Sequence, residues 1–568
     1  MSKIKLLIVG LDAATLDLVN PWVGEGKLPN LAQLMKEGVS GRLASILPPI
    51  TPPAWTSFMT GKNPGKHRIF HFMEAEPGSY SLRYVNASSR CAKTIWKMLS
   101  DAGFSVGTMN IPFTYPPEHL NGFQISGMDT PSEKSAFVYP PEIRDELEGL
   151  LGRFTLDVRY LGYMSTDRRR EEVLAEMERI DQQWLQASLH LMEKHPAEVL
   201  MFTFMSVDTV QHYFWHYMDA SHHYHDPVGA KRFGDAILRV YERLDRAVGE
   251  MLKKVSTDTS VLVVSDHGGG PTSDRVVYLN RFLAQQGLLH YLENNDSALK
   301  KLARGLIHRS YTLLRGALSS AQKRKLANAL PKMRKRFETA FTSFTNIDWS
   351  RTKAYCSEVL ASPPSIWINR KGIKPFGIVE ESDYESLIKF ITEKIGELKD
   401  PRTNEPVIKR ILRREEIFHG PYADQAADLI LDWWEASHFS SSPSFPEQTT
   451  EPAVMIRERK PPEDSEWGGT HRLHGILIVR GPAFRKNVEI EGARLLDMAP
   501  TILHLLGQPV PDDMDGHVLE ELFEPSFLAQ NPVQRRSGDG SGWQQQVAYS
   551  AEESAIVEQR LKDLGYIE

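Results

Sequence analysis

The sequence predicts an α/β fold in which a largely parallel β-sheet lies between layers of helices. Short apolar runs alternate along the chain with segments of helical periodicity. Hydrophobic residues make up 41% and charged residues 25% of the 568 residues, which is typical of globular proteins rather than of disordered or collagen-like chains. Three apolar runs stop at acidic residues, and open parallel sheets bind ligands at the carboxyl ends of their strands.

We expect strands where the apolar runs are short, and helices where apolar residues recur every three or four positions. The expected strands are Ile4–Leu11, Ser105–Met109, Val199–Phe204, Ser260–Val264 and Ile476–Val479. The expected helices are Ala92–Ala102, Arg170–Lys194, Ala230–Lys254, Tyr384–Leu398 and Leu495–Leu506. No apolar run reaches the roughly 18 to 20 residues that a membrane-spanning helix needs, so we expect a soluble chain.

The two cysteines, Cys91 and Cys356, are too few for a disulfide scaffold or a cysteine-based zinc module. A metal ion would therefore be held by histidine, aspartate or glutamate. The first apolar run is too short for a signal peptide and lacks a small-residue cleavage site, so we expect a cytoplasmic protein.

The net charge of −6 hides a basic segment at Ser297–Ala340, which has twelve Lys or Arg and one acid, Glu338. Its local balance is +11, so the rest of the chain carries −17. Because most of the protein is acidic, we expect no nucleic-acid partner. The helical spacing of its leucines fits either contact with an anionic membrane surface or a solvated cap over the core.

We divide the chain into four parts on these grounds. Residues 1–290 form the first part of an α/β core, and residues 291–345 form a basic helical insertion that is a cap or faces a membrane. Residues 346–525 form the second part of the core and include a long surface loop, 437–469, rich in Ser, Pro and Glu. Residues 526–568 form a linker and a C-terminal helix.

Candidate metal ligands follow the expected strands. Asp208 and His212 are four residues apart, so both side chains can share one face of a helix that starts near Asp208. The other candidates are Asp12, the adjacent pair Asp266 and His267, and His471 in a Gly-Gly-Thr-His turn. Three aspartates and three histidines suit two divalent ions such as zinc or manganese.

Two further groups of histidines are alternatives. His474 lies three residues after His471, but it already opens an expected strand, so His471 is the preferred ligand. The group His222, His223 and His225 could bind a metal, although we interpret it as a solvated loop.

Thr51 is the candidate nucleophile. Prolines follow it and favour the first turn of a helix, so Thr51 is expected at or just before the N-terminus of a helix that runs to Thr60. Its hydroxyl would meet unpaired backbone N–H groups and the positive end of the helix dipole, which favour phosphate. A nearby metal ion would lower its pKa. The alternative is a threonine that only caps the helix.

The order of these motifs resembles the alkaline phosphatase superfamily, and most closely its type I phosphodiesterase/nucleotide pyrophosphatase branch. The matching motifs are Gly-Leu-Asp12, Thr51-x-Pro, Thr-Gly61-x-x-Pro-x-x-His67, Asp208-x-x-x-His212, Ser-Asp266-His267-Gly and Gly-x-His471. The segment from Asp497 to Leu503 and the Met-Asp515-Gly516 turn are similar to the closing helix and turn of that superfamily. The resemblance covers roughly residues 4–290 and 350–525.

The resemblance implies an alkaline-phosphatase-like core and a phosphoric ester as substrate. One ion would be held by Asp12, Thr51, Asp266 and His267, and the other by Asp208, His212 and His471. The ions would be zinc, with manganese as the alternative. It further implies in-line attack by the Thr51 hydroxyl, a phospho-threonine intermediate, and hydrolysis by water activated at the second ion.

Departures from the family leave the substrate open. The resemblance to nucleotide pyrophosphatases implies an asparagine three residues after Thr51 that holds a phosphoryl oxygen, but this chain has Ala54 at that position. A phosphomonoesterase, a phosphosugar mutase, or an enzyme acting on lipid-linked phosphate at a membrane are therefore alternatives to a phosphodiesterase. A sulfatase would need Cys or Ser followed by x-Pro-x-Arg. The segment Thr51-Pro-Pro-Ala-Trp55 has neither the Cys or Ser nor the arginine. A pure membrane adaptor would not need a complete set of ligands.

Overall fold

A large central sheet organises the computed structural model, which describes residues 4–76, 78–80, 82–152, 154–156, 164, 166–292, 346–357, 363–444, 446–457, 467–538 and 549–563. In this part of the chain the sheet has nine strands in the order β20-β2-β19-β9-β1-β8-β5-β6-β7. The strands are β1 (Leu6–Leu11), β2 (Val39–Ala44), β5 (Val106–Ile111), β6 (Gly122–Ser126), β7 (Val138–Tyr139), β8 (Val199–Phe204), β9 (Ser260–Val264), β19 (His474–Arg480) and β20 (Val488–Ile490). The neighbours β9, β1, β8, β5 and β6 run parallel, whereas β19 and β7 are antiparallel to them.

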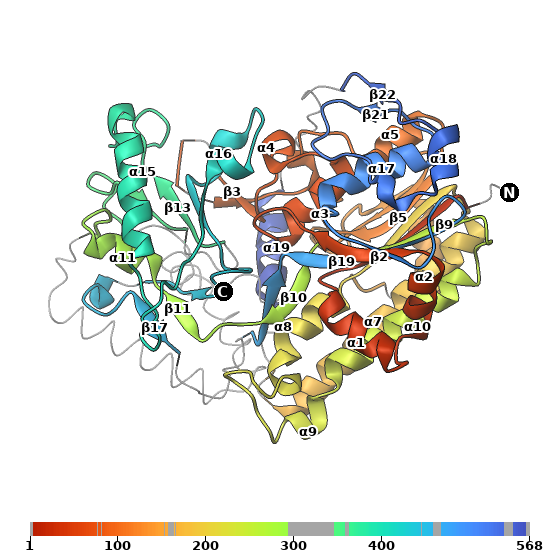
Figure 1. Cartoon of the computed structure of the whole chain (residues 1–568), viewed down its shortest axis with the longest axis horizontal. Helices are drawn as coiled ribbons and strands as arrows, with labels where there is room; N and C mark the ends of the chain where they lie inside the picture. The colour runs from red at the N-terminus through yellow and green to blue at the C-terminus, as the bar shows by residue number, and fades with distance from the viewer. Residues whose placement is uncertain are drawn as a thin grey trace.

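Helices cover both faces of this sheet (Figure 1). One face packs against α1 (Leu16–Gly24), α2 (Pro29–Glu37), α6 (Glu142–Leu151), α7 (Asp167–Lys194) and α10 (Ala236–Leu252). The other packs against α3 (Thr51–Thr60), α5 (Ile95–Asp101) and α17 (Met498–Leu505). The predicted α/β fold with a mostly parallel sheet between helical layers is therefore confirmed.

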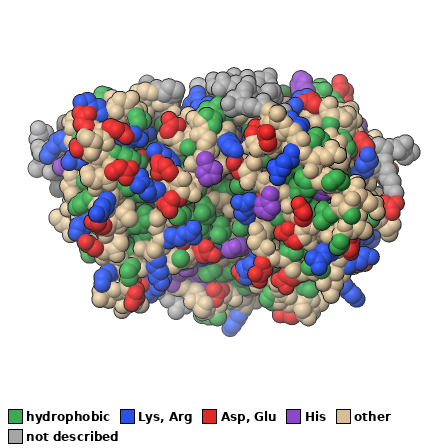
Figure 2. All heavy atoms as spheres, turned by 45° about the horizontal axis from the view of Figure 1, so that its top comes forward, with side chains coloured by type: hydrophobic (Ala, Val, Ile, Leu, Met, Phe, Trp, Pro, Cys, Tyr) green, Lys and Arg blue, Asp and Glu red, His purple; other side chains and the backbone are tan. Residues whose placement is uncertain are grey.

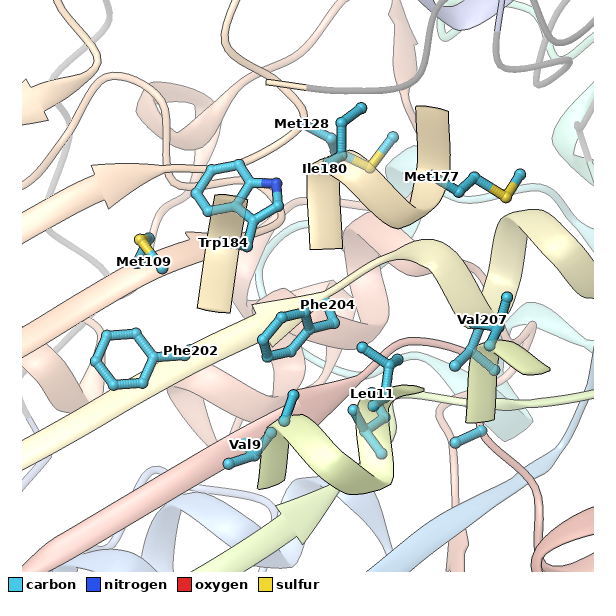
Figure 3. Packing of buried hydrophobic residues seen from close by; sticks show 14 of the residues in the cluster. Val9, Leu11, Met109, Met128, Met177, Ile180, Trp184, Phe202, Phe204 and Val207 are labelled. Atoms are coloured by element: carbon cyan, nitrogen blue, oxygen red, sulfur yellow. The ribbon is translucent and has the colours of Figure 1, made fainter. Parts of the chain in front are cut away.

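The two hydrophobic clusters follow the alternation of side chains along the strands. In β1, Leu7 and Val9 belong to one cluster, while Leu6 and Ile8 belong to the other, because successive strand residues point to opposite faces. Figure 3 shows Val9, Leu11, Phe202 and Phe204 on one face of β1 and β8, below Trp184 and Ile180 of α7. Both faces of the central strands are buried, which holds their carboxyl ends in fixed positions.

Most of the expected elements are present. Strands β8 and β9 have the predicted bounds, and β1, β5 and β19 differ by a few residues at their ends. The expected helix Ala230–Lys254 is divided into α9 (Ala230–Phe233) and α10, which are separated by Gly234 and Asp235. The expected C-terminal helix is α19 (Ala551–Asp563), and the helix after Thr51 ends at Thr60 as predicted.

Within residues 346–525, which are predicted to be the second part of the core, some of the described residues form a second, smaller sheet. Four short strands form a separate sheet in the order β12-β13-β15-β14. They are β12 (Ala354–Tyr355), β13 (Ser365–Ile368), β14 (Ile411–Arg413) and β15 (Leu429–Leu431), and they pack with α11 (Leu279–Gln285) and α15 (Glu381–Gly396) in their own hydrophobic cluster. Strands of two to four residues are too short to show a period in the sequence. This unit, which we call the small-sheet unit, lies beside the main sheet in Figure 1.

Part of the expected surface loop 437–469 is also ordered into strands. The strands β16 (Ser440–Ser441) and β17 (Val454–Ile456) pair with β11 (Arg275–Val277). The basic segment 297–340 lies outside the described residues. Among the described helices, none combines the length and the apolar composition needed to cross a membrane.

The helix α8 (Ser206–Met218) has 13 residues and follows β8. The other α-helices and strands are short: α4 (Pro64–His67), α16 (Arg414–Ile417), α18 (Pro525–Gln530), β3 (Met73–Ala75), β4 (Leu82–Tyr84), β10 (Gly268–Pro271), β18 (Gly469–Arg472), β21 (Val510–Pro511) and β22 (Arg535–Arg536). On the face shown in Figure 2, acidic and basic side chains of the described residues are interspersed rather than gathered by sign.

Candidate active site

Three neighbouring strands bring the predicted residues to one edge of the sheet. Asp12 follows β1, Asp208 lies in the first turn of the helix after β8, and Asp266 follows β9. Because β9, β1 and β8 are parallel neighbours, their carboxyl ends meet. His471 reaches the same place on β18, where it pairs with Gly269 of β10.

The acidic and imidazole side chains form two groups, each with ligand atoms within 4.8 Å of one another. The Asp12 cluster consists of Asp12, Asp266 and His267. The Asp208 cluster consists of Asp208, His212 and His471. All six side chains are buried, and the rings of His267 and His471 stack at 3.8 Å, so the two clusters are in contact.

Short distances between ligand atoms define each cluster. In the Asp208 cluster, Asp208 Oδ1 lies 3.1 Å from His212 Nε2 and 3.4 Å from His471 Nε2. The two Nε2 atoms lie 3.1 Å apart. In the Asp12 cluster, His267 Nε2 lies 3.3 Å from Asp266 Oδ2 and 3.8 Å from Asp12 Oδ1.

The three histidines share one hydrogen-bond pattern. In each ring Nδ1 faces a backbone carbonyl, which can only accept, so Nδ1 carries the proton and donates it. When such a ring is neutral, as a metal ligand must be, its lone pair is on Nε2, and this atom points into the cluster. The acceptors for His212, His267 and His471 are the carbonyls of Gly469, Gly268 and Pro49, at 2.9, 3.1 and 2.9 Å.

Thr51 lies next to the Asp12 cluster. Its Oγ1 is 3.2 Å from Nε2 of His267, and its side chain is fully buried. Thr51 is the first residue of α3, and Ile50 occupies the capping position with an extended backbone. The alternative role of Thr51 as a capping side chain is therefore wrong, since the structure records no side-chain cap for this helix.

One expectation about this helix end needs correction. Unpaired N–H groups near Thr51 are expected from the sequence, but Pro52 and Pro53 have no N–H. The N–H of Ala54 donates to the carbonyl of Ile50 at 3.0 Å. The helix end therefore offers few backbone donors to an anion, and a bound phosphate would need positive charge from another source.

Burial and neighbouring charges act differently on the carboxylates of the two clusters. Burial, together with repulsion from Asp266 and Asp208, raises the pKa of Asp12 well above its usual value. Burial and repulsion from Asp208 raise the pKa of Asp266 in the same way. Burial alone would also raise the pKa of Asp208, but His212 and His471 lower it well below its usual value.

Two side chains that the sequence analysis did not single out also contact this site. Trp55 Nε1 donates to Asp12 Oδ2 at 2.7 Å. Gln211 Nε2 donates at 2.8 Å to the carbonyl of Ala13, whose φ of 60° is left-handed. In the sequence, Trp55 lies one helical turn after Thr51 and Gln211 lies between two candidate ligands, but neither position indicates which residue the side chain contacts.

The alternative histidines lie outside both clusters. His474 is a third exposed, and its Nδ1 is 4.0 Å from Glu435. The rings of His222 and His223 stack on each other at 4.3 Å, and Nδ1 of His225 faces the carbonyl of His216. Among the described residues, none of these histidines belongs to a group with metal-binding geometry.

His67, the last residue of one matching motif, and its neighbour Arg68 have structural contacts. Burial lowers the pKa of His67 to about 3, and Nε2 of this histidine lies 2.9 Å from Ser57 Oγ. Arg68 forms an ion pair with Glu74 at 3.1 Å. Neither residue reaches the two clusters through a contact that the structure records.

Comparison with protein families gives one extended match. The sequence model of the family described as type I phosphodiesterase / nucleotide pyrophosphatase matches residues 6–450. This range includes six of the seven predicted site residues, and His471 lies beyond it.

Individual curated relatives match only a short segment. The 2,3-bisphosphoglycerate-independent phosphoglycerate mutase of Cereibacter sphaeroides is 40% identical over 63 residues, which are 10% of this chain and 12% of the mutase. The enzyme of the same name from Rhodopirellula baltica is 45% identical over 62 residues, which are 10% of this chain and 11% of the mutase. The chain therefore spans about a tenth of the length of these relatives.

Solved structures match over most of the chain at low identity. Phosphonoacetate hydrolase from Sinorhizobium meliloti, in complex with phosphonoformate, aligns with a TM-score of 0.50 and 15% identity, covering 88% of this chain and 94% of that chain. Murine ectonucleotide pyrophosphatase / phosphodiesterase 5 aligns with a TM-score of 0.48 and 14% identity, covering 92% of this chain and all of that chain. At this identity, the phosphonoacetate hydrolase shows a shared fold.

Proposed function

Because the chain belongs to the type I phosphodiesterase/nucleotide pyrophosphatase family, we propose that it is a metal-dependent hydrolase of phosphoric esters that acts through Thr51. The observation that supports this most directly is the pair of buried clusters beside the Thr51 hydroxyl. The family resemblance named from the motifs agrees with the family match.

The donor atoms fit divalent metal ions. Asp12 Oδ1 and Asp266 Oδ2 are buried and have no hydrogen-bond partner among the described residues. Buried carboxylate oxygens without partners are costly unless a cation balances them. The Nε2 atoms of His212 and His471 also lie 3.1 Å apart, an arrangement that a shared cation would stabilise. Nitrogen and oxygen ligands of this kind suit zinc, with manganese as the alternative.

Each cluster would hold one ion. Asp12, Asp266 and His267, together with Thr51, would hold the first, and Asp208, His212 and His471 would hold the second. Two bound dications would supply the positive charge that draws in a phosphoryl group and offsets the charge on its oxygens. The end of α3 cannot supply this by itself, because Pro52 and Pro53 lack N–H groups.

The chain's own residues account for the positioning of the nucleophile. Thr51 is fixed in the first turn of α3, with its hydroxyl 3.2 Å from His267 Nε2. The positive charge of a bound ion would lower the pKa of this hydroxyl, so that it gives its proton to water. The hydroxyl oxygen would then attack phosphorus in line with the leaving alcohol and form a phospho-threonine. Water would then attack phosphorus, release a phosphate monoester from a diester substrate or phosphate from a monoester substrate, and restore the Thr51 hydroxyl.

The test compares hydrolysis of bis(4-nitrophenyl) phosphate with that of 4-nitrophenyl phosphate, with zinc or manganese added. We expect the diester to be hydrolysed faster, and we expect Thr51→Ala to lower kcat/KM by at least about 10³-fold. Thr56→Ala is the matched control, since Thr56 is equally buried on the same helix and its hydroxyl donates to the carbonyl of Pro52. Activity that survives in Thr51→Ala would identify a different nucleophile.

The phosphomonoesterase or mutase alternative is supported by the local match to phosphoglycerate mutases. A monoester rate above the diester rate would favour it, and transfer of phosphate between two hydroxyls of a sugar acid would identify a mutase. A cytoplasmic location and membrane contact through residues 297–340 stay predictions. Loss of sedimentation with anionic vesicles after deletion of that segment would support the membrane contact.

A further inference from the structure

The indole of Trp55 makes a specific contact with the candidate metal site. Trp55 Nε1 donates to Asp12 Oδ2 at 2.7 Å, and both side chains are fully buried. The other oxygen, Asp12 Oδ1, has no hydrogen-bond partner among the described residues and lies on the side of His267, 3.8 Å from its Nε2. The indole therefore fixes one carboxylate oxygen and leaves the second directed into the Asp12 cluster.

The strand below the indole is shaped to receive it. A Cβ atom at Gly10 would lie 3.0 Å from the ring of Trp55 and 2.8 Å from Thr203 Oγ1. The backbone of Gly10 is not left-handed, so space rather than conformation requires glycine here. Phe58 packs edge-on against Trp55 with ring centroids 5.5 Å apart. The position of the indole is thus set by neighbours on β1 and α3.

A second tryptophan in the same hydrophobic cluster provides a comparison. Trp96 is also fully buried and packs near Phe58, with ring centroids 6.4 Å apart. Its Nε1 has no hydrogen-bond partner among the described residues. Apolar packing in this cluster therefore does not require a partner for the indole N–H, and the bond from Trp55 to Asp12 is a separate feature.

We propose that Trp55 is a positioning residue that orients the Asp12 carboxylate for the divalent cation shared with Asp266 and His267. This inference rests on the proposed function, which assigns a cation to the Asp12 cluster. Trp55 lies one turn after Thr51 on α3, so one helix would carry the nucleophile and align a ligand of the ion beside it. Hydrogen-bond partners of metal ligands typically contribute about 10- to 100-fold to metal affinity.

The test titrates the metal-stripped full-length protein with Mn²⁺ or Zn²⁺ by calorimetry. We expect the wild-type protein to bind two ions, and Trp55→Phe to weaken one of the two by about 10- to 100-fold while the other keeps its affinity. Trp96→Phe is the matched control, because it removes the same ring from the same cluster, and both affinities should stay at the wild-type value.

A second variant separates the hydrogen bond from the packing. Replacing Trp55 by benzothienylalanine, in which sulfur stands in place of the N–H, keeps the shape of the ring and removes only the donor. The same loss of affinity for one ion is expected. If Trp55→Phe does not fold, this variant carries the test alone.

Each outcome bears on the proposal. Wild-type affinity for both ions in the benzothienylalanine protein would overturn the role of Trp55 and leave the proposed function intact. A wild-type protein that binds no divalent ion would instead contradict the proposed function itself, and the role of Trp55 with it.

Discussion

The Asp12 cluster and the Asp208 cluster lie in contact but differ in charge balance. The Asp12 cluster has two carboxylates and one imidazole. Burial raises the pKa of both carboxyl groups, together with repulsion from Asp266 and Asp208 on Asp12 and from Asp208 on Asp266. The Asp208 cluster has one carboxylate between two imidazoles, and these hold the pKa of Asp208 low against the effect of burial. The first cluster therefore depends more on an added cation than the second.

The two clusters also differ in how the chain builds them. Asp208 and His212 lie one turn apart on α8, so local helix geometry sets their spacing. Asp12 and Asp266 come from the ends of two different strands, β1 and β9, and meet only because those strands are neighbours. The Asp208 cluster is thus partly fixed by local structure, whereas the Asp12 cluster depends on the sheet and on the contact from Trp55.

The largest expected effects come from removing one ligand of each cluster. We expect Asp266→Ala and His212→Ala each to lower kcat/KM by about 10³-fold, because each removes several kcal/mol of charge stabilisation. Metal analysis after dialysis should find one ion instead of two in each variant. His474→Ala is the control, since His474 lies outside both clusters, and it should keep two ions and full activity.

This result would also test how independent the clusters are. The rings of His267 and His471 stack, but the two groups share no ligand, so the ion that remains in Asp266→Ala should bind with nearly wild-type affinity. Loss of both ions from either variant would show that the clusters assemble only together.

A smaller effect, of opposite sign in the two clusters, is expected for the metal-free protein. A carboxyl group with a raised pKa in the folded state contributes stability at low pH and loses it as the pH rises through that pKa. Asp12→Asn should therefore increase the free energy of unfolding of the metal-free protein at neutral pH. Asp208 has a lowered pKa, so it contributes stability at neutral pH that is lost as the pH falls, and Asp208→Asn should decrease stability there.

Urea unfolding of the metal-stripped proteins at neutral and acidic pH measures both effects. The difference between each variant and the wild-type protein should shrink as the pH falls toward the range in which the carboxyls are protonated in both states. The same sign of effect in both variants would contradict the contrast in charge balance.

Local features made much of this site predictable from the sequence. The apolar run of β8 and the polar residues after it are contiguous, so the strand bounds and the position of Asp208 follow from period and composition. The family resemblance then joined residues as distant as Asp12 and His471. The sequence also shows that Pro52 and Pro53 lack N–H groups. This already argues against a phosphate site built from backbone donors at this helix end.

Contacts between distant residues with no motif could not be predicted. Trp55 and Asp12 are 43 positions apart, and an indole in a hydrophobic helix reads as core packing until its N–H is placed. The small-sheet unit is not predicted for another reason. Its strands have two to four residues and pair with strands that are distant in the sequence, as β13 does with β15. Their stability comes from tertiary packing rather than from a local pattern.

The smallest expected effect concerns the link between the clusters. Gln211 lies on α8 between Asp208 and His212, and it donates to the carbonyl of Ala13, the residue after Asp12. Ala13 has a φ of 60°, which costs an alanine about 1 kcal/mol or more and is maintained by its surroundings. Gln211→Ala should lower the free energy of unfolding by about 1 kcal/mol and loosen the turn that carries Asp12.

Metal titration separates this link from a general loss of stability. Gln183→Ala is the matched control, because Gln183 is also buried and donates at 2.8 Å to a backbone carbonyl, that of Thr155, on a different helix. Both variants should lose similar stability, but only Gln211→Ala should weaken an ion, by a few-fold, and that ion should be the one that Asp266→Ala removes. Equal metal affinities in the two variants would mean that the sheet alone holds the Asp12 turn. The two clusters would then differ in their charge balance but not in how the chain holds their ligands in place.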